Sequence, residues 1–436
     1  MEVLSTLALT LGAFLLLMFA GFPISFSFLA VMLGCSLILM GPVSGWSFFL
    51  GSVFDSLTTF TLTPIPMFIM MGSILFHSGI AMRSVDALSK CLGSIPGRLS
   101  ILANLTGGLL GLLSGSTLGT TALLGTLLAP EMRERGYSKT MTYGPILAAG
   151  GLAMVIPPSN LTVIYATIAH ISVGKLLVSG LVPGLMMMSF YIIIIVARTL
   201  LNPSLAPRYE VARSPFGEVL RALLIDVFPL GLIIFLVTGF IVIGVATPTE
   251  AAATGAAGAF LLAALYRRLK WETVVKTMQE TVKITVMVFM IVAGSITYSQ
   301  ILAYSGISRV ITENILALTV SPSLTLLVMM IVILLLGTLM DQVAIIMITV
   351  PIFTPIVAAL GIDPFLFGIL MLINLEIALT TPPFGMLLFV MKGVATEDVS
   401  MGDLYRSAFP FILSDMTVML TIFFFPSIAL WLPSLS

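Results

Sequence analysis

The chain has 436 residues, of which 59% are hydrophobic and only 9% are charged. A soluble domain contains about 25% charged residues, so this composition excludes a soluble globular protein and predicts an all-α, polytopic membrane protein. Lys plus Arg and Asp plus Glu are equal at 19 each, so the charge balance indicates neither a nucleic acid nor an acidic partner.

Apolar stretches of about 20 residues predict membrane-spanning helices. The first runs into the second through Gly21-Phe22-Pro23 without a signal-peptide cleavage site, so we expect it to be retained. The predicted spans are 4–20, 24–40, 47–76, 140–169, 176–198, 224–244, 248–266, 284–303, 362–391 and 407–432. Short amphipathic arms are expected at 81–96 and 305–320.

Two further apolar regions are interrupted by polar residues at their midpoints. Region 99–130 contains Ser114-Gly115-Ser116, and region 322–358 contains the segment from Gly337 to Gln342. Their arms of about 14–18 residues are short for a full span at ~1.5 Å rise per residue. We interpret both regions as re-entrant hairpins, and the alternative makes each one a pair of full spans.

The distribution of basic residues supports this topology through the positive-inside rule. If the N-terminus lies outside and each hairpin returns to its side of origin, all Lys and Arg residues except Lys175 and Arg309 fall inside. Treating both hairpins as full pairs of spans gives the same loop sides in the first half of the chain. The charges therefore support the set of spans and leave the two interpretations of the hairpins open.

The two halves of the sequence align with each other. Three pairs of residues share an offset of 225 without a gap: Pro130 with Pro355, Gly136 with Gly361, and Pro158 with Pro383. Each half contains three spans, an arm, a hairpin, a proline-broken span and a final span. The first unit starts outside and the second starts inside, which predicts inverted repeats of the kind found in secondary transporters.

Two proline pairs, Pro157-Pro158 and Pro382-Pro383, predict breaks within apolar spans. Irregular backbone within a bilayer is tolerated where it is buried in protein or lines a cavity. Corresponding breaks in two halves point to the binding site of a transporter. We therefore expect the irregular segments to meet near mid-membrane, and these segments are 114–117, 156–160, 337–342 and 380–383.

The chemistry of these segments favours ion and solute binding over catalysis. They are rich in hydroxyl groups and freed carbonyls, and they hold a single ionisable residue, Asp341. Hard cations such as Na⁺ favour oxygen ligands, whereas the N-termini of half-helices suit an anionic substrate. The cysteines, Cys35 and Cys91, form no metal motif. Because no catalytic, Walker or dinucleotide motif is evident, we predict a transporter and not an enzyme.

Several polar residues also have a structural interpretation. The small residues at the first hairpin tip suit close helix packing. Asp341 is a functional candidate because an intramembrane acid is costly, but it also suits a helix cap. Glu376 either binds a ligand or bridges groups inside the bundle. Glu250 follows a proline at the start of a helix, where a first-turn acid predicts capping.

The motifs resemble the large membrane subunit (DctM-like) of tripartite ATP-independent periplasmic, or TRAP, transporters over nearly the whole chain. In order, they are GFPISFSF, PMFIMMG, SGSTLGTTALLGTLLAPEMRERGYS, IPPSN, SVGKLLVSGLVPGL, ATPTEAAA, GTLMDQVAIIMITVPIFTPIVAALGIDP, NLEIALTTPPFGMLLFV and LWLP. Two positions depart from the family pattern. An Ala-Asp pair often follows the first tip, where this chain has Thr117-Leu-Gly-Thr120, and Asp341-Gln342 stands where Asp-Pro is frequent.

The resemblance implies an elevator-type secondary transporter of the bacterial inner (plasma) membrane, with a periplasmic N-terminus and no cofactor. It implies Na⁺-driven import of a small organic anion, a carboxylate or sugar acid. The implied partners are a four-helix membrane subunit, expected as a separate polypeptide, and a periplasmic substrate-binding protein. The alternative is a two-hairpin, ion-coupled carrier that works without a binding protein.

The resemblance also implies a division of the chain and two sodium sites. Scaffold spans are expected at 1–80, and a cytoplasmic linker with the second set of scaffold spans at 201–304. Arms are expected at 81–97 and 305–321, and the halves of a moving transport domain at 98–200 and 322–436. The implied sodium residues are Ser114, Gly115, Ser116, Ser159 and Asn160 at one site, and Gly337, Asp341, Thr380 and Thr381 at the other. Substrate is expected at Ser116, Thr117, Asn160, Asp341 and Thr381.

Overall fold

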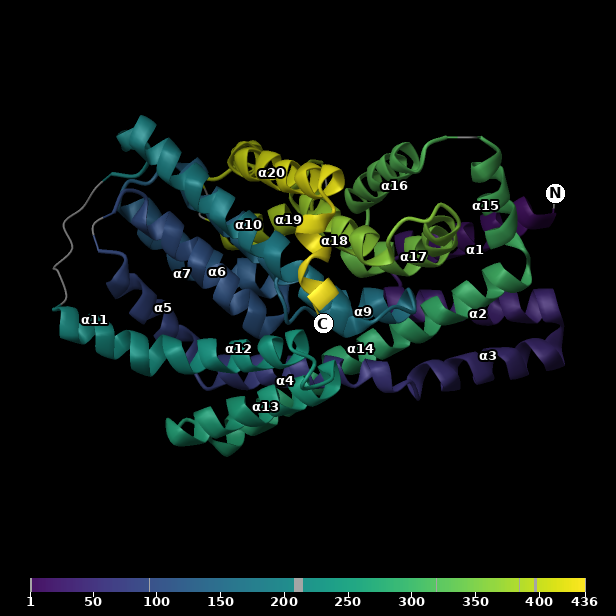
Figure 1. The fold of residues 1–436 in the computed structure, drawn as a ribbon, viewed down its shortest axis with the longest axis horizontal. Helices are drawn as coiled ribbons and strands as arrows, with labels where there is room; N and C mark the ends of the chain where they lie inside the picture. Colours follow the sequence, from purple (N-terminus) through teal and green to yellow (C-terminus); the bar gives the residue numbers. More distant parts are fainter. Residues whose placement is uncertain are drawn as a thin grey trace.

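The computed structural model describes residues 2–93, 95–207, 215–318, 320–383, 385–395 and 398–435, and the regular elements within them are all helical (Figure 1). The helices of the first half are α1 (Glu2–Phe19), α2 (Ile24–Met40), α3 (Pro42–Leu57), α4 (Pro64–His77), α5 (Ile80–Cys91), α6 (Arg98–Ser114), α7 (Thr117–Glu134), α8 (Lys139–Gly151), α9 (Asn160–Ile168) and α10 (Val173–Leu201).

The helices of the second half follow the same order. They are α11 (Phe216–Ala222), α12 (Phe228–Val242), α13 (Pro248–Leu265), α14 (Trp271–Tyr304), α15 (Ile307–Ala317), α16 (Pro322–Gly337), α17 (Gln342–Ala359), α18 (Pro364–Thr380), α19 (Met386–Val394), α20 (Met401–Phe424) and α21 (Ser427–Leu430). A π-helical turn, Leu223–Val227, joins α11 to α12, so Phe216–Val242 is one apolar helix.

The third span of the first half is broken, whereas that of the second half is continuous. The prediction of a single helix over 47–76 is therefore wrong. The structure divides this stretch into α3 and α4, separated by the 3-10 turn Phe60–Leu62. Pro64 begins α4 at a position where its missing N–H needs no partner. Thr58 and Thr59 donate their hydroxyl groups to carbonyls at the end of α3, at 2.9 Å each, which satisfies that helix end.

The counterpart of this broken span is the unbroken, 34-residue helix α14. The predicted span 284–303 covers only its second half. The sequence prediction placed Lys276 and Lys283 in a connecting segment on the inside because of their charge. In the structure both residues lie within α14, and this difference bears directly on the site described below.

The two predicted hairpins appear as α6 with α7 and α16 with α17, and the arms appear as α5 and α15. Among the described residues, six helical segments are long and apolar enough to cross a membrane, and one of them, Gln342–Ala359, is the second arm of a predicted hairpin. The re-entrant course of the hairpins therefore stays a prediction. Glu250 caps α13 as predicted, because it forms a capping box with Thr247.

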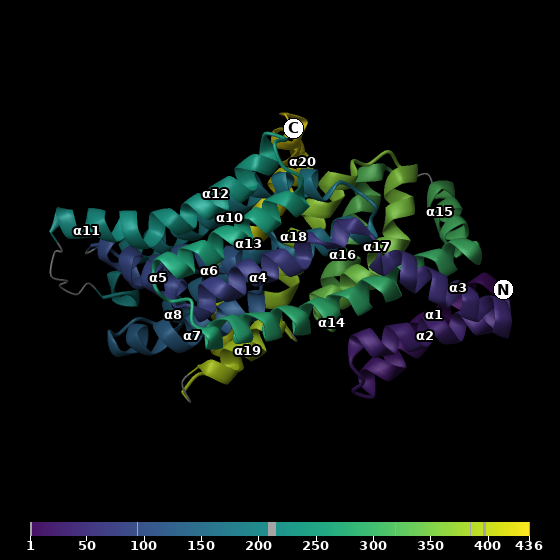
Figure 2. The same cartoon turned by 90° about the horizontal axis from the view of Figure 1, so that it is seen from below.

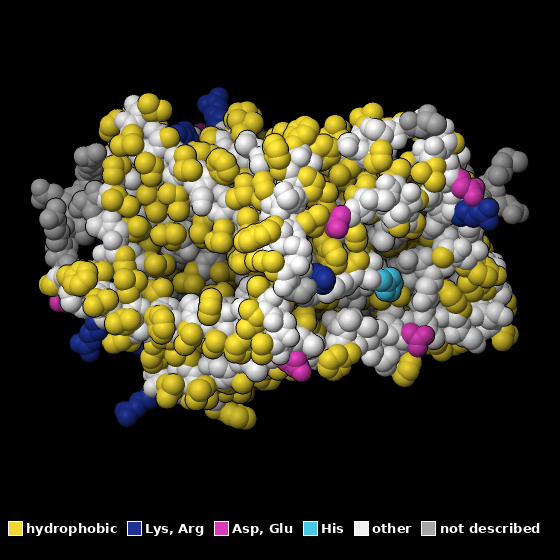
Figure 3. All heavy atoms as spheres, viewed as in Figure 1, with side chains coloured by type: hydrophobic (Ala, Val, Ile, Leu, Met, Phe, Trp, Pro, Cys, Tyr) yellow, Lys and Arg dark blue, Asp and Glu magenta, His cyan; other side chains and the backbone are white. Residues whose placement is uncertain are grey.

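The helices pack in two groups, which lie in the lower and upper halves of Figure 1 and overlap in the view from below (Figure 2). One group contains α2, α4, α13 and α14, in which α4 packs against α13 and α14, and α14 packs against α2. The other group contains the hairpins with α8, α18 and α20. Figure 3 shows a largely hydrophobic face with most of its visible Lys and Arg atoms toward one end, as expected for a surface in contact with lipid.

Candidate functional site

Both predicted helix breaks are present in the structure. Helix α8 ends at Gly151 and continues as a 3-10 turn over Leu152–Met154, and α9 begins at Asn160. In the second half, α18 ends at Thr380 and α19 begins at Met386. Both Pro-Pro peptide bonds, Pro157-Pro158 and Pro382-Pro383, are cis. Each break leaves one helix C-terminus and one helix N-terminus within the body of the protein.

The tip of the first hairpin packs against the first break. Gly115 ends α6 with a φ of +58°, a conformation that glycine adopts without steric cost. A Cβ atom at Gly115 would lie only 2.4 Å from Nδ2 of Asn160. Ser116 caps α7 by accepting a hydrogen bond from the N–H of Gly119 at 3.1 Å. The tip of the first hairpin therefore lies against the start of α9, as the sequence predicts.

The second hairpin has a similar relation to the second break. Asp341 caps α17, and its Oδ1 accepts a hydrogen bond from the N–H of Val343 at 2.7 Å. A Cβ atom at Gly337 would lie 2.2 Å from the Cβ of Ala378 in α18. The arm and the broken helix thus approach each other as closely as a glycine permits.

A cavity of about 770 Å³ lies where these elements meet. Its lining includes five of the predicted residues: Gly115, Ser116, Thr117, Asn160 and Asp341. It also includes the first residues of four helices: Thr117 of α7, Asn160 of α9, Gln342 of α17 and Met386 of α19. Helix N-termini present free N–H groups and a partial positive charge. Their convergence makes this cavity suited to an anion.

One functional candidate in this cavity was missed by the sequence prediction. Of the described residues that line the cavity, Lys283 of α14 is the only one with a cationic side chain. The prediction placed Lys283 on the inside, in the segment that connects the predicted spans 248–266 and 284–303. Its position about three turns inside a long helix could have been predicted only by continuing the helical pattern upstream.

Some predicted residues lie near the breaks but do not line this cavity. Ser159 is fully buried and donates its hydroxyl group to the carbonyl of Met154 at 2.7 Å. Thr380 and Thr381 both donate to the carbonyl of Ile377, at 3.1 and 2.5 Å. Together with Gly337 they lie at helix ends behind the cavity. The side chain of Ser114 lies outside the described part of the structure.

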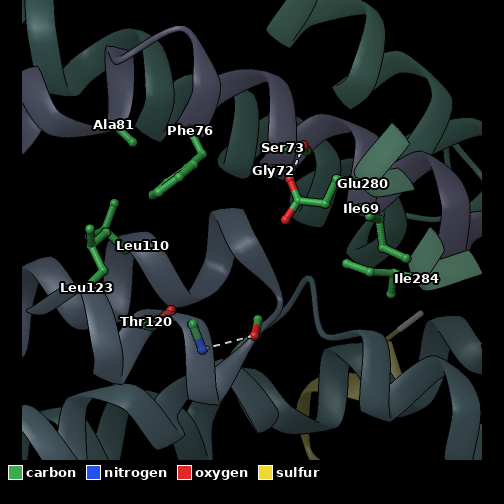
Figure 4. A pocket seen from close by; sticks show the side chains of 12 residues that line it. Ile69, Gly72, Ser73, Phe76, Ala81, Leu110, Thr120, Leu123, Glu280 and Ile284 are labelled. Atoms are coloured by element: carbon green, nitrogen blue, oxygen red, sulfur yellow. Dashed lines mark hydrogen bonds between the residues drawn. The ribbon is translucent and has the colours of Figure 1, made fainter. Parts of the chain in front are cut away.

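A second, smaller cavity of about 140 Å³ adjoins the first hairpin tip (Figure 4). Glu280 of α14 faces it, and Oε2 of Glu280 accepts hydrogen bonds from Ser73 at 2.5 Å and from His77 at 2.8 Å. Ser116 and Ile284 line both cavities. The first hairpin tip is therefore reachable from two sides, one beside Lys283 and one beside Glu280.

Comparison with known proteins gives one consistent family. The family model described as "Tripartite ATP-independent periplasmic transporter, DctM component" matches residues 11–428. The chain is 36% identical over 386 residues to the C4-dicarboxylate TRAP transporter large permease protein DctM of Pseudomonas aeruginosa, covering 88% of each chain. It is 30% identical over 426 residues to the sialic acid TRAP transporter large permease protein SiaM of Vibrio cholerae, covering 96% of each.

A likeness to a solved structure concerns the fold alone. The YdaH transporter of Alcanivorax borkumensis superimposes with a TM-score of 0.65 at 15% sequence identity. The match covers 92% of this chain and 98% of that chain. The helical architecture is thus shared with a membrane transporter of distant sequence.

Proposed function

The chain belongs to the DctM family of tripartite ATP-independent periplasmic transporter permeases, and from this premise we propose that it imports a small organic anion with Na⁺. It is a multi-pass membrane protein and the large permease subunit of its transporter. The proposal adds the solute class, the coupling ion, the movement and the partners.

The observation that carries the proposal is the convergence of four helix N-termini and Lys283 on one cavity. Backbone N–H groups at helix N-termini can bind a carboxylate without a dedicated cation. Lys283 adds a full positive charge, and a charge-assisted hydrogen bond to a carboxylate is roughly twice as strong as a neutral one. The solutes in the names of the two relatives, C4-dicarboxylates and sialic acid, are carboxylates. A carboxylate is therefore the proposed solute class.

The ends of the preceding helices suit the coupling ion. Gly115, Gly337 and Thr380 stand at the C-termini of α6, α16 and α18, where carbonyl groups lack helical partners and the helix dipole is negative. Within the described residues, no group of three His, Cys, Asp or Glu side chains could hold a metal ion. Carbonyl and hydroxyl oxygens are the ligands that a hard monovalent cation takes. We therefore place the Na⁺ ions at these C-termini, behind the solute.

The packing supports an elevator movement as the mechanism. Lys283 belongs to the group of α2, α4, α13 and α14, whereas the tips and broken helices belong to the other group. Movement of the second group past the first would carry the tips and their ions across the membrane while Lys283 stays in place. The proposed setting is the bacterial inner membrane with the N-terminus in the periplasm. The proposed partners are a separate four-helix subunit and a periplasmic binding protein.

Reconstitution of the complete system tests this proposal. Liposomes containing the chain and its small subunit would receive the binding protein, a labelled C4-dicarboxylate or sialic acid, and an inward Na⁺ gradient. We expect uptake only with both the gradient and the binding protein present. Equal uptake without Na⁺ would refute the coupling. Equal uptake without the binding protein would favour the alternative of a two-hairpin carrier that binds solute directly.

A further inference from the structure

A fully buried acid lies away from the cavity, about one turn before the end of α18. Glu376 has no solvent exposure, and neither oxygen of its carboxyl group has a hydrogen-bond partner in the structure. It does not line the 770 Å³ cavity. An ionised carboxylate in such a position is strongly destabilising, because nothing replaces the water that it lost. An ionisable residue inside a membrane protein is a functional candidate for the same reason.

Glu376 contacts the residue that corresponds to it in the other repeat. Gly151 ends α8, and it lies 225 residues before Glu376, the same offset that relates the proline pairs. A Cβ atom at Gly151 would lie 1.6 Å from the carboxyl carbon of Glu376. The carboxyl group thus packs directly on the backbone of α8. The two broken helices meet here, with an acid on one and a glycine on the other.

A second buried acid accompanies Glu376. Asp415 of α20 is 1% exposed, and its Oδ1 accepts a hydrogen bond from the hydroxyl group of Tyr191 at 2.5 Å. The helices that carry these three side chains, α10, α18 and α20, all pack against one another. The three side chains come from α18, α20 and α10 and form one polar cluster, which we call the acid pair with its tyrosine.

No other charged group compensates the acid pair. Asp415 and Tyr191 face Glu376 from helices packed against α18, and the buried Tyr143 lies about two turns before Gly151 on α8. Other charged side chains on or next to these helices have partners of their own: Lys139 with Asp403, Arg198 with Thr140, Lys392 with Val399, and Asp341 with Val343. Lys175 of α10 and Arg406 of α20 are exposed. Tyr165 of α9 packs near Phe367, more than two turns before Glu376. The cluster therefore holds two acids and no cation among the described residues.

We propose that Glu376 and Asp415 bind one exchangeable proton, and that this proton holds α18 against α8 within the part of the permease that carries the hairpins. Tyr191 supplies a donor to Asp415 only, so the proton resides on Glu376. Binding converts the carboxylate and a solution proton into a carboxylic acid, and release reverses this step with no other reactant. A Na⁺ ion needs several oxygen ligands, whereas a proton needs no space beside Gly151.

The effect of this proton on uptake rests on the proposed transport function, whereas its effect on protein stability can be tested without it. Thermal unfolding of the purified protein would be followed in detergent from pH 6 to pH 9. We expect the wild type to lose stability toward alkaline pH, because release of the proton leaves a buried charge. Glu376→Gln keeps the shape of the side chain but has no proton to lose, so the thermal stability of this variant should not change from pH 6 to pH 9. The matched control Glu313→Gln changes an acid on α15 that pairs with Arg309 at 2.7 Å, and it should keep the wild-type pH dependence.

Uptake measurements extend the test to transport. At a fixed Na⁺ gradient, we expect wild-type uptake to fall on the alkaline side by up to about tenfold per pH unit, as for loss of a single proton. Glu376→Gln should remove this fall while Na⁺ dependence persists. A wild-type pH profile in Glu376→Gln, in stability and in uptake, would overturn the inference. Absence of uptake in the wild type would refute the proposed function and leave the stability test valid.

A third variant tests the inference even if Glu376→Gln does not fold. Tyr191→Phe removes the donor that stabilises ionised Asp415. The acid pair should then hold its proton more tightly, so the alkaline transition should move to higher pH. A purely structural role for Tyr191 predicts a lower melting temperature at every pH and no movement of the transition, and that result would also overturn the inference.

Discussion

The side-chain amide of Gln342 donates a hydrogen bond to the hydroxyl oxygen of Thr117, at 3.4 Å and across 225 residues of sequence. Each residue is the first of the second arm in its own hairpin. The offset is the one that relates the two repeats, so two equivalent positions contact each other. Both residues line the 770 Å³ cavity. The hairpin tips therefore meet directly, and the contact closes one side of the cavity.

This contact predicts coupled effects of substitution. Thr117→Val and Gln342→Met each remove one partner, and we expect uptake to fall about two- to tenfold in each, since a hydrogen bond contributes ~0.5–1.5 kcal/mol. The double variant should be no slower than the slower single variant, because the same interaction is lost only once. Thr126→Val is the control, since that hydroxyl group bonds within α7 to Ala122. Multiplied effects in the double variant would show that the tips act independently.

We predict that Gly115 is needed for the contact with Asn160 at the site, and not only for the turn that ends α6. Gly115→Ala would place a methyl group 2.4 Å from Asn160 at a φ of +58°. Gly136→Ala is a matched control, because Gly136 has a φ of +79° and its nearest neighbouring atom would be 3.5 Å away. Both variants should lose about 1–2 kcal/mol of stability from the left-handed backbone. We expect only Gly115→Ala to lose Na⁺-dependent uptake, and equal uptake in both would contradict the arrangement.

Lys283 is predicted to contact the anionic solute. Lys283→Gln should raise the solute concentration needed for half-maximal uptake about tenfold or more, because a hydrogen bond to a charged group contributes ~1.5–3 kcal/mol. Lys276→Gln is the control on the same helix, where Lys276 pairs with Glu272 at 2.7 Å on the exposed side. That surface pair contributes ~0–1 kcal/mol, so its loss should leave uptake unchanged. An unchanged half-maximal concentration in Lys283→Gln would remove Lys283 from the solute site.

The sequence predicted the helix breaks and the hairpin tips because glycine and proline act locally. The positive φ of Gly115 and the break after Gly151 follow from residues within a few positions. The same local chemistry predicted the capping box of Glu250. The family resemblance added the expected pairing of each tip with its broken helix.

The rest depends on contacts between distant segments, which local patterns do not contain. The role of Lys283 depends on where α14 packs, and charge alone placed it at the membrane boundary. The break between α3 and α4 is an exception, because it was missed although Thr58, Thr59 and Pro64 give a local signal for it. The position of Glu376 against Gly151 follows from the crossing of α18 and α8. The repeat alignment pairs these two residues in sequence, but it does not predict that they touch.

Asp341 offers a test that separates a helix cap from an ion-binding charge. Its Oδ1 caps α17 at Val343, and the residue also lines the cavity. Asparagine caps a helix about as well as aspartate, whereas alanine does not. Asp341→Asn should therefore keep the melting temperature, and Asp341→Ala should lose ~0.5–2 kcal/mol of stability. If the charge binds the coupling ion, both variants should need much more Na⁺ for uptake.

Asp363 provides the matched control, because its Oδ1 caps α18 by accepting from Phe365 at 2.8 Å and from Leu366 at 3.0 Å, outside the cavity. Asp363→Asn should change neither stability nor Na⁺ dependence, and Asp363→Ala should change stability alone. Uptake by Asp341→Asn at wild-type Na⁺ concentrations would reduce Asp341 to a cap. The second sodium site would then rest on the carbonyl groups at the ends of α16 and α18, which no side-chain substitution removes.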